Sequence, residues 1–161
     1  MALIVSKGID AELSLVGDGS QKQLLIDRAA KLKLNNRVIL HGFQDKPDQY
    51  VRQCNLYVQP SISEGFGLAL VEAMGCAVPV IATAVGGAPE IIEDGHTGWL
   101  IHKTDATTIA NKLLEVLAMT DEQLFDIGLQ GYKSVEKRFE PSAYMAELES
   151  LYIRELHKVN H

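Results

Sequence analysis

The sequence predicts a doubly wound α/β fold, in which a parallel sheet of about five strands carries helices on both faces and is followed by C-terminal helices. Two observations predict it. Short runs rich in β-branched residues alternate with longer segments of helical period as far as Ile101, and only helical patterns follow. A repeated strand, helix, strand order is typical of parallel sheets with right-handed crossovers. The 161 residues, 47% of them hydrophobic and without an internal repeat, indicate a single domain.

Each element is expected from its own local pattern. Five buried strands are predicted at residues 11–16, 37–40, 55–60, 79–83 and 98–101. Helical segments are predicted between them at 21–34, 47–54 and 67–74, with a turn at 88–93. Three further helices are predicted at 105–119, 121–139 and 141–157, the last with a proline near its first turn. Residues 2–5 are interpreted as the remnant of a helix, with a substitute strand as the alternative.

Composition argues against several classes of partner. A net charge of -6 and a pI near 5.3 disfavour binding to nucleic acid or to an anionic membrane surface. No apolar run approaches the roughly 18 residues of a membrane span, and no secretory signal pattern is present. Cys54 and Cys76 have no paired spacing and are expected as reduced thiols. We therefore expect a cytoplasmic domain, although a longer parent protein could act at the inner face of the membrane.

No metal site or cofactor is expected. Of the five histidines only His157 and His161 have i, i+4 spacing, and the sequence contains no pair of aspartates separated by one residue. Each histidine is therefore interpreted as a solvated or core side chain.

Three loops are predicted to form a ligand site, because ligands of open parallel sheets bind beyond the carboxyl ends of the strands. The loops are Gly17–Gly19, Gly42–Asp45 and Ser61–Gly67. Their glycines let the backbone approach a ligand closely. A helix starting near Phe66 would also aim free N–H groups and a partial positive charge at an anion. A phosphate is the expected ligand.

Two carboxylates, Glu64 and Glu72, flank the start of this predicted helix. If helical geometry holds from Glu64 onward, the rise per residue separates them by about 12 Å along the axis. Paired acids in glycoside hydrolysis work at about 5 to 9.5 Å, so this pair is better suited to the two ends of an extended ligand. A sugar at Glu64, a diphosphate over the helix start and a ribose at Glu72 would together be a nucleotide sugar.

The order of these motifs resembles the donor-binding, C-terminal domain of retaining glycosyltransferases with the GT-B fold, a Rossmann-like domain, and in particular their family 4, or group 1. Glu64 and Glu72, with seven residues between them, match the paired glutamates of that family. The resemblance runs from LSLVGDG through PSISEGFGLALVEAM to VPVIATAVGGAPEIIEDGHTGWL, about residues 11–118. It implies transfer of a sugar from a nucleoside diphosphate, linked to UDP or GDP, to an acceptor hydroxyl with retention of configuration.

The resemblance also implies roles for individual residues. Glu64 would be the catalytic residue that binds hydroxyls of the donor sugar, and Glu72 would bind the ribose hydroxyls. The sugar and the distal phosphate would meet the backbone amides of Gly65, Phe66, Gly67 and Leu68.

Two further loops receive roles in the same way. Gly17 and Gly19 would line the phosphate side of the site. Phe43 and Gln44 would lie where the family holds the base.

One part of the family pattern has no match. Members carry an arginine and a lysine on a loop upstream of the GDG segment, where they neutralise the departing diphosphate, and Lys7 lies too close to the first strand to be that lysine. The acceptor-binding N-terminal domain is also unmatched. We therefore interpret the chain as a domain truncated at its N-terminus and inactive alone. A nucleotide-sugar epimerase and a non-catalytic doubly wound binding module remain the alternatives.

The truncation has a consequence for the sheet. In the family's strand order the unmatched strand lies between the first and third strands predicted here. Because unpaired strand edges are costly when buried and adhesive when exposed, we expect these two strands to close up into one 2-1-3-4-5 sheet, or the chain to self-associate.

Overall fold

The structure is a computed structural model that describes residues 1–139. The helix predicted at 141–157 lies outside these residues. The helices are α1 (Ala2–Ser6), α2 (Lys22–Lys31), α3 (Asp48–Val51), α4 (Leu68–Gly75), α5 (Ala88–Ile91), α6 (Ala106–Leu117) and α7 (Asp121–Phe139). The strands are β1 (Leu13–Val16), β2 (Val38–Gly42), β3 (Tyr57–Gln59), β4 (Val80–Thr83) and β5 (Trp99–Ile101). Every predicted strand is present, although β1 and most of β2 are not buried as predicted. The helix α1 confirms the helical interpretation of residues 2–5.

A three-stranded parallel sheet in the order β3-β4-β5 forms the centre of the molecule. All four residues of β4 are buried and nearly all apolar, as a strand covered on both faces requires. Val80 and Ala82 face one side, in a core with Leu70 and Met74 of α4. The alternate residue Ile81 faces the other side.

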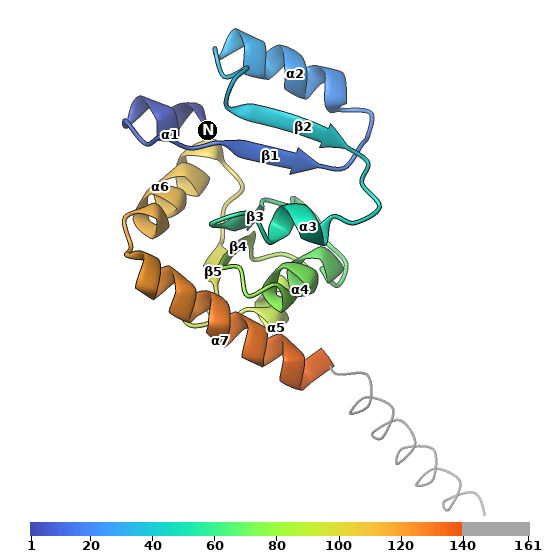
Figure 1. Cartoon of the computed structure of the whole chain (residues 1–161), viewed down its shortest axis with the longest axis vertical. Helices are drawn as coiled ribbons and strands as arrows, with labels where there is room; N and C mark the ends of the chain where they lie inside the picture. Colours follow the sequence, from blue (N-terminus) through green and yellow to red (C-terminus); the bar gives the residue numbers. More distant parts are fainter. Residues whose placement is uncertain (140–161) are drawn as a thin grey trace, which may run out of the picture.

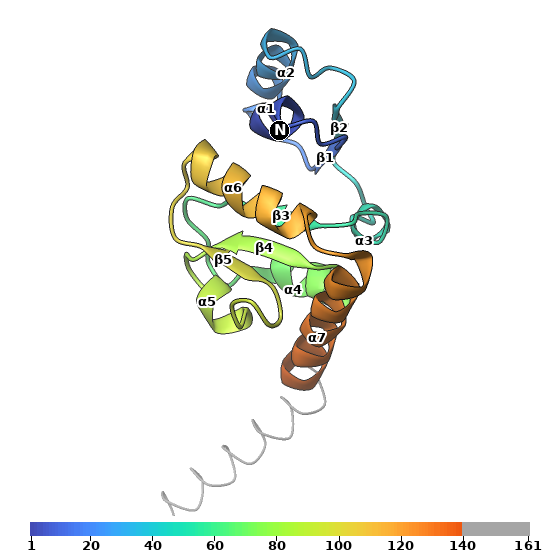
Figure 2. The same ribbon diagram turned by 90° about the vertical axis from the view of Figure 1, so that its left-hand side faces the viewer.

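The second core contains Ile81, Trp99 and Ile101 from the sheet and Val116 from α6. Figure 2 shows α6 on one face of this sheet and α4 and α5 on the other. The helix α7 contacts α4, and its Val135 is buried in the α4 core. The predicted arrangement, a parallel sheet with helices on both faces and further helices after it, is therefore confirmed.

A smaller unit consists of β1, β2 and α2, in which β1 pairs with β2 in parallel from Leu13 and Val38 onward. Few apolar side chains are buried in it, among them Ala29 and Leu34. The helix α1 packs against α6, with Ile4 almost fully buried, and so connects the N-terminal segment to the main body (Figure 1).

The expected closure of the sheet is wrong. The strands form two sheets, β1-β2 and β3-β4-β5, and β1 does not pair with β3. The free edges of β1 and β3 are therefore left without a strand partner in the described part of the chain. A sheet of only two short strands has little stability of its own. This unit also buries little apolar surface, since side chains of α2 and β2 are exposed, Leu24 and Ile39 among them.

Within residues 1–139 no helix combines the length and the apolar character that crossing a membrane requires.

Candidate functional site

Glu64 lies on the loop between β3 and α4, and three hydrogen bonds fix its carboxylate. Oε2 accepts from Nε2 of Gln59 at 2.8 Å and from Oγ of Ser61 at 3.2 Å. Oε1 accepts from the backbone N–H of Gly65 at 3.1 Å. The buried hydroxyl of Thr83 on β4 donates to the carbonyl of Ser61 at 2.6 Å and so fastens this loop to the sheet. The carboxylate is therefore held in one orientation before any ligand arrives.

The Glu64 loop also packs directly against the turn that follows β4. The backbone N–H of Gly87 donates to the carbonyl of Gly65 at 2.9 Å. A β-carbon at Gly87 would lie 2.3 Å from the carbonyl oxygen of Phe66, and one at Gly86 would lie 2.1 Å from that of Glu64. Because only glycine permits such an approach, Gly86 and Gly87 allow the Glu64 loop to lie against the turn after β4.

The helix α4 begins at Leu68, with Gly67 as its N-cap in a left-handed conformation at φ 94°. The prediction of a start near Phe66 is therefore two residues early. The assumption of helical geometry from Glu64 is wrong, since residues 64–67 form a loop, and the axial separation of about 12 Å does not apply. The first-turn N–H groups of α4 still lack intrahelical acceptors, as at any helix start.

Glu72 lies on α4 with an exposed side chain. Its position is linked to that of Glu64 through Tyr57 on β3. Burial raises the pKa of the Tyr57 hydroxyl above its usual value, and the negative charges of Glu72 and then Glu64 raise it further. Both carboxylates therefore act on one half-buried phenol, and the structure brings the two predicted glutamates to the same region.

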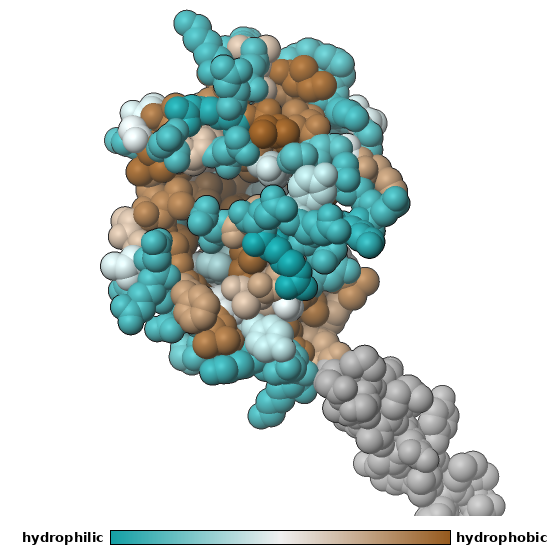
Figure 3. Space-filling model, in the orientation of Figure 1, coloured by the Kyte–Doolittle hydropathy of each residue, from teal (hydrophilic) through white to brown (hydrophobic). Residues whose placement is uncertain are grey.

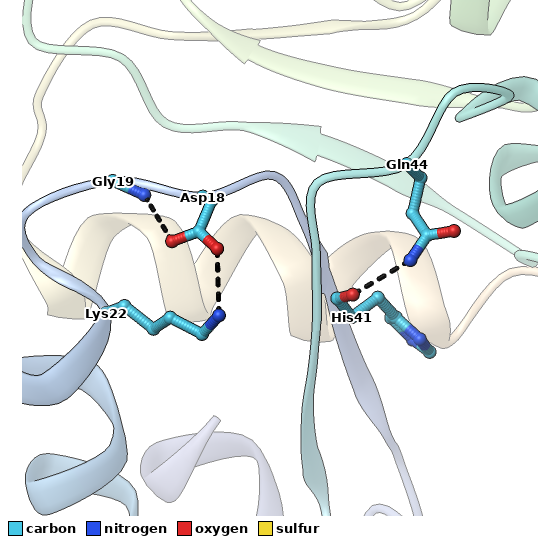
Figure 4. Close-up of polar contacts among 5 residues, drawn as sticks. All are labelled: Asp18, Gly19, Lys22, His41 and Gln44. Atoms are coloured by element: carbon cyan, nitrogen blue, oxygen red, sulfur yellow. Dashed lines mark hydrogen bonds and ion pairs between the residues drawn. The ribbon is translucent and has the colours of Figure 1, made fainter.

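The loops after β1 and β2 lie in the smaller sheet. Gly17, at φ 129°, donates its N–H to the carbonyl of Gly42 at 2.8 Å, which holds the two loops together. Asp18 accepts from the N–H of Gly19 and pairs with Lys22 at 2.9 Å (Figure 4). The hydrogen bond from Lys22 and the Gly19 amide keep the pKa of Asp18 below its usual value.

The two residues predicted beside a base behave differently from each other. Gln44 donates from Nε2 to the carbonyl of His41 at 2.9 Å, so its amide group is already engaged (Figure 4). Phe43 is 74% exposed and its ring is available for stacking.

The predicted site residues thus form two groups. Glu64, Gly65, Phe66, Gly67 and Leu68 lie together between the carboxyl end of β3 and the start of α4, and Glu72 lies about one turn further along α4. Gly17, Gly19, Phe43 and Gln44 follow β1 and β2 in the other sheet. Sequence reasoning missed the supporting residues Tyr57, Gln59 and Thr83. A glutamine at the end of an apolar strand was a signal that could have indicated a polar network.

A hollow of about 730 Å³ lies elsewhere, at the amino ends of β1 and β2. Its lining includes Asp10, Glu12, Lys33 and Arg37, and Arg37 is paired with Asp10 at 2.5 Å. It contains none of the predicted site residues. The lining contains both carboxylates and cations, so its charge favours neither an anionic nor a cationic ligand.

The fold has the architecture of GT-B glycosyltransferase structures. The Anabaena protein Alr3699/HepE, solved with UDP and glucose, matches 92% of this chain with a TM-score of 0.80 and 29% identity, over 44% of its own chain. Sucrose-phosphate synthase from Thermosynechococcus elongatus matches 96% of this chain with a TM-score of 0.83 and 29% identity, over 41% of its own chain.

The family model described as "Glycosyl transferases group 1" matches residues 1–133, and the chain belongs to this family. Among curated proteins it is similar to N-acetyl-alpha-D-glucosaminyl L-malate synthase of Bacillus anthracis, with 36% identity over 89% of this chain. It is also similar to the capsular polysaccharide biosynthesis glycosyltransferase CapM of Staphylococcus aureus, with 36% identity over 93% of this chain. The chain spans 38% and 40% of the lengths of these two relatives.

Proposed function

We propose that the chain is the donor-binding domain of a retaining glycosyltransferase, which binds a nucleoside diphosphate sugar for transfer of the sugar to an acceptor hydroxyl. The observation that carries this proposal is the orientation of Glu64 by three donors beside the start of α4, with Glu72 on the same helix. Membership of the glycosyl transferases group 1 family supports it.

Each part of the site has a role in this proposal. Glu64 accepts hydrogen bonds from hydroxyls of the donor sugar. The sugar and the distal phosphate contact the backbone of residues 65–68, where the N–H groups at the start of α4 favour negative charge. Glu72 accepts from the ribose hydroxyls.

The remaining predicted residues complete the donor site from the smaller sheet. Gly17 and Gly19 face the phosphates, and Phe43 stacks on the base with Gln44 beside it. Both groups of residues follow the carboxyl ends of parallel strands, the end at which α/β sheets bind ligands.

Catalysis in this proposal rests on stabilising the negative charge of the departing diphosphate rather than on a metal ion or a cofactor. The helix start of α4 supplies part of that stabilisation. The upstream arginine and lysine of the family, and an acceptor-binding domain, would supply the rest. The 161-residue chain alone is therefore proposed to bind the donor without transferring its sugar. Its proposed compartment is the cytoplasm.

The donor base is proposed to be uracil or guanine. Alr3699/HepE was solved with UDP and glucose and also with UDP-glucose, which supports testing the uridine nucleotides first. The epimerase and the non-catalytic binding module have no specific observation in their favour.

Calorimetric titration of the chain with UDP, GDP and their sugars tests the proposal. We expect saturable binding of one nucleotide series and no change on adding a metal chelator. Absence of binding in both series would contradict a donor site. Sugar transfer by the purified chain above the buffer background would contradict its inactivity.

A further inference from the structure

A chain of hydrogen bonds links the sheet to the Glu64 carboxylate through Gln59. The hydroxyl of Tyr57 donates to Oε1 of Gln59 at 3.1 Å, and Nε2 of Gln59 donates to Oε2 of Glu64 at 2.8 Å. Gln59 is the last residue of β3 and only 8% exposed. Its side chain is therefore enclosed between the phenol and the carboxylate.

The two ends of the Gln59 amide cannot exchange places without loss. A flipped amide would turn its carbonyl oxygen toward the Glu64 carboxylate, and two acceptors would face each other. The Glu64 carboxylate, which only accepts, therefore fixes the unflipped orientation, and the Tyr57 hydroxyl matches it by donating to the amide oxygen. A buried amide satisfied at both ends in this way gives its neighbour one defined position.

The hydrogen bonds on Glu64 also show which of its oxygens can serve a ligand. A carboxylate oxygen accepts about two hydrogen bonds. Oε2 already accepts two, from Gln59 and Ser61, whereas Oε1 accepts one, from the N–H of Gly65. The remaining acceptor site is therefore on Oε1, on the side of the loop that leads into α4.

We propose that Gln59 is a positioning residue for donor-sugar recognition: it occupies Oε2 of Glu64 and so leaves Oε1 to accept a single sugar hydroxyl beside the Gly65 amide. The inference rests on the proposed function, because it takes Glu64 as the residue that meets the sugar. It narrows that function, because a single sugar hydroxyl, rather than several, then meets the Glu64 carboxylate. Gln59 itself does not touch the ligand.

The first test compares ligands with and without the sugar. Binding of UDP-glucose, UDP, GDP-mannose and GDP is measured by calorimetry for the wild type and for Gln59→Met, which keeps the length of the side chain but removes both amide hydrogen bonds. Gln53→Met is the matched control, since Gln53 is exposed just after α3.

We expect Gln59→Met to weaken binding of the nucleotide sugar about tenfold, because a misplaced Glu64 loses its hydrogen bond to the sugar hydroxyl and a bond to a charged group is worth at least that much. Binding of the free nucleoside diphosphate, which does not meet Glu64, should stay within about twofold. A residue with a merely structural role would weaken both ligands equally. Equal weakening of both, or no weakening of either, overturns the proposal. Tyr57→Phe is expected to produce the same selectivity at a smaller amplitude.

A second measurement needs no ligand. The side-chain amide hydrogens of Gln59 are followed by nitrogen-edited NMR during exchange with deuterated water. We expect slow exchange in the wild type and faster exchange in Glu64→Ala. Equal rates in the two proteins overturn the positioning of Glu64. If the wild type binds none of the four ligands, the proposed function fails together with the donor-sugar part of this inference, while the exchange rates still decide whether Gln59 holds Glu64.

Discussion

Gly86 lies against Glu64 so closely that a β-carbon on the glycine would stand 2.1 Å from the glutamate's carbonyl oxygen. The carbonyl oxygen of Gly65 would be 2.5 Å away. Backbone atoms cannot move aside as a flexible side chain can, so the turn after β4 and the Glu64 loop fit each other only when residue 86 has no side chain.

Gly86→Ala is therefore expected to destabilise the protein and to displace Glu64. The φ of 55° is left-handed, which costs a residue with a β-carbon about 1 kcal/mol or more, and the clash with backbone adds about 1 to 3 kcal/mol. We expect the free energy of unfolding to fall by about 2 to 4 kcal/mol, measured by urea denaturation. The matched control is Gly75→Ala at the end of α4, where nothing lies within 4 Å of the new β-carbon. Similar stability of the two variants would contradict the close approach.

Tyr57 is expected to titrate at higher pH than an ordinary tyrosine, since burial and the charges of Glu72 and Glu64 favour its neutral form. The folded state therefore retains this proton to higher pH than the unfolded state does. The resulting contribution to stability is complete below the unfolded pKa, near 10, and is lost as pH rises through the folded pKa.

The measurement is the phenolate absorbance of wild type and Tyr57→Phe as a function of pH. The difference between the two curves reports Tyr57, and its midpoint should lie above the ordinary value. A second variant, Glu72→Gln, should move the midpoint down, because one of the two raising charges is removed. An unchanged midpoint in Glu72→Gln would show that the charge of Glu72 does not reach the Tyr57 hydroxyl.

Glu72→Ala is expected to weaken nucleotide binding by about 1.5 to 3 kcal/mol, because it removes a charged acceptor for the ribose hydroxyls. UDP and UDP-glucose should lose affinity equally, since both carry the ribose. Calorimetric titration checks this, with Glu122→Ala as a control because Glu122 is an exposed glutamate in the first turn of α7. Unchanged affinity in Glu72→Ala would remove ribose recognition from the proposed site.

Local patterns predicted most of the fold. The alternation of apolar residues in β4, with Val80 and Ala82 on one face and Ile81 on the other, follows directly from the period of a strand. The start of α4 was harder to predict from the sequence, because a left-handed Gly67 delays the helix to Leu68. Glycine tolerates many conformations, and its presence in a sequence does not say which one is used.

Contacts between distant segments could not be predicted in the same way. The division into two sheets depends on whether β1 meets β3, a pairing that no local pattern specifies. In the site, the resemblance named Glu64 and Glu72, but the orientation of Glu64 depends on Gln59 and on Thr83, which acts from another strand. The support from Thr83 arises from the pairing of β4 with β3, and a motif carries no information about it.

The free edges of β1 and β3 predict self-association, since an exposed strand edge offers unpaired N–H and carbonyl groups to another chain. Hydrophobic surface over the region of β1, β2 and α2 favours this contact (Figure 3). We expect the sedimentation coefficient of the chain to rise with protein concentration.

Val16→Lys places a charge on β1, where the side chain is 37% exposed, and should shift the chain toward the monomer. Phe125→Lys, on an exposed position of α7 far from both edges in sequence, should not. A sedimentation coefficient independent of concentration in the wild type, or equal responses of the two variants, would show that these edges do not mediate association.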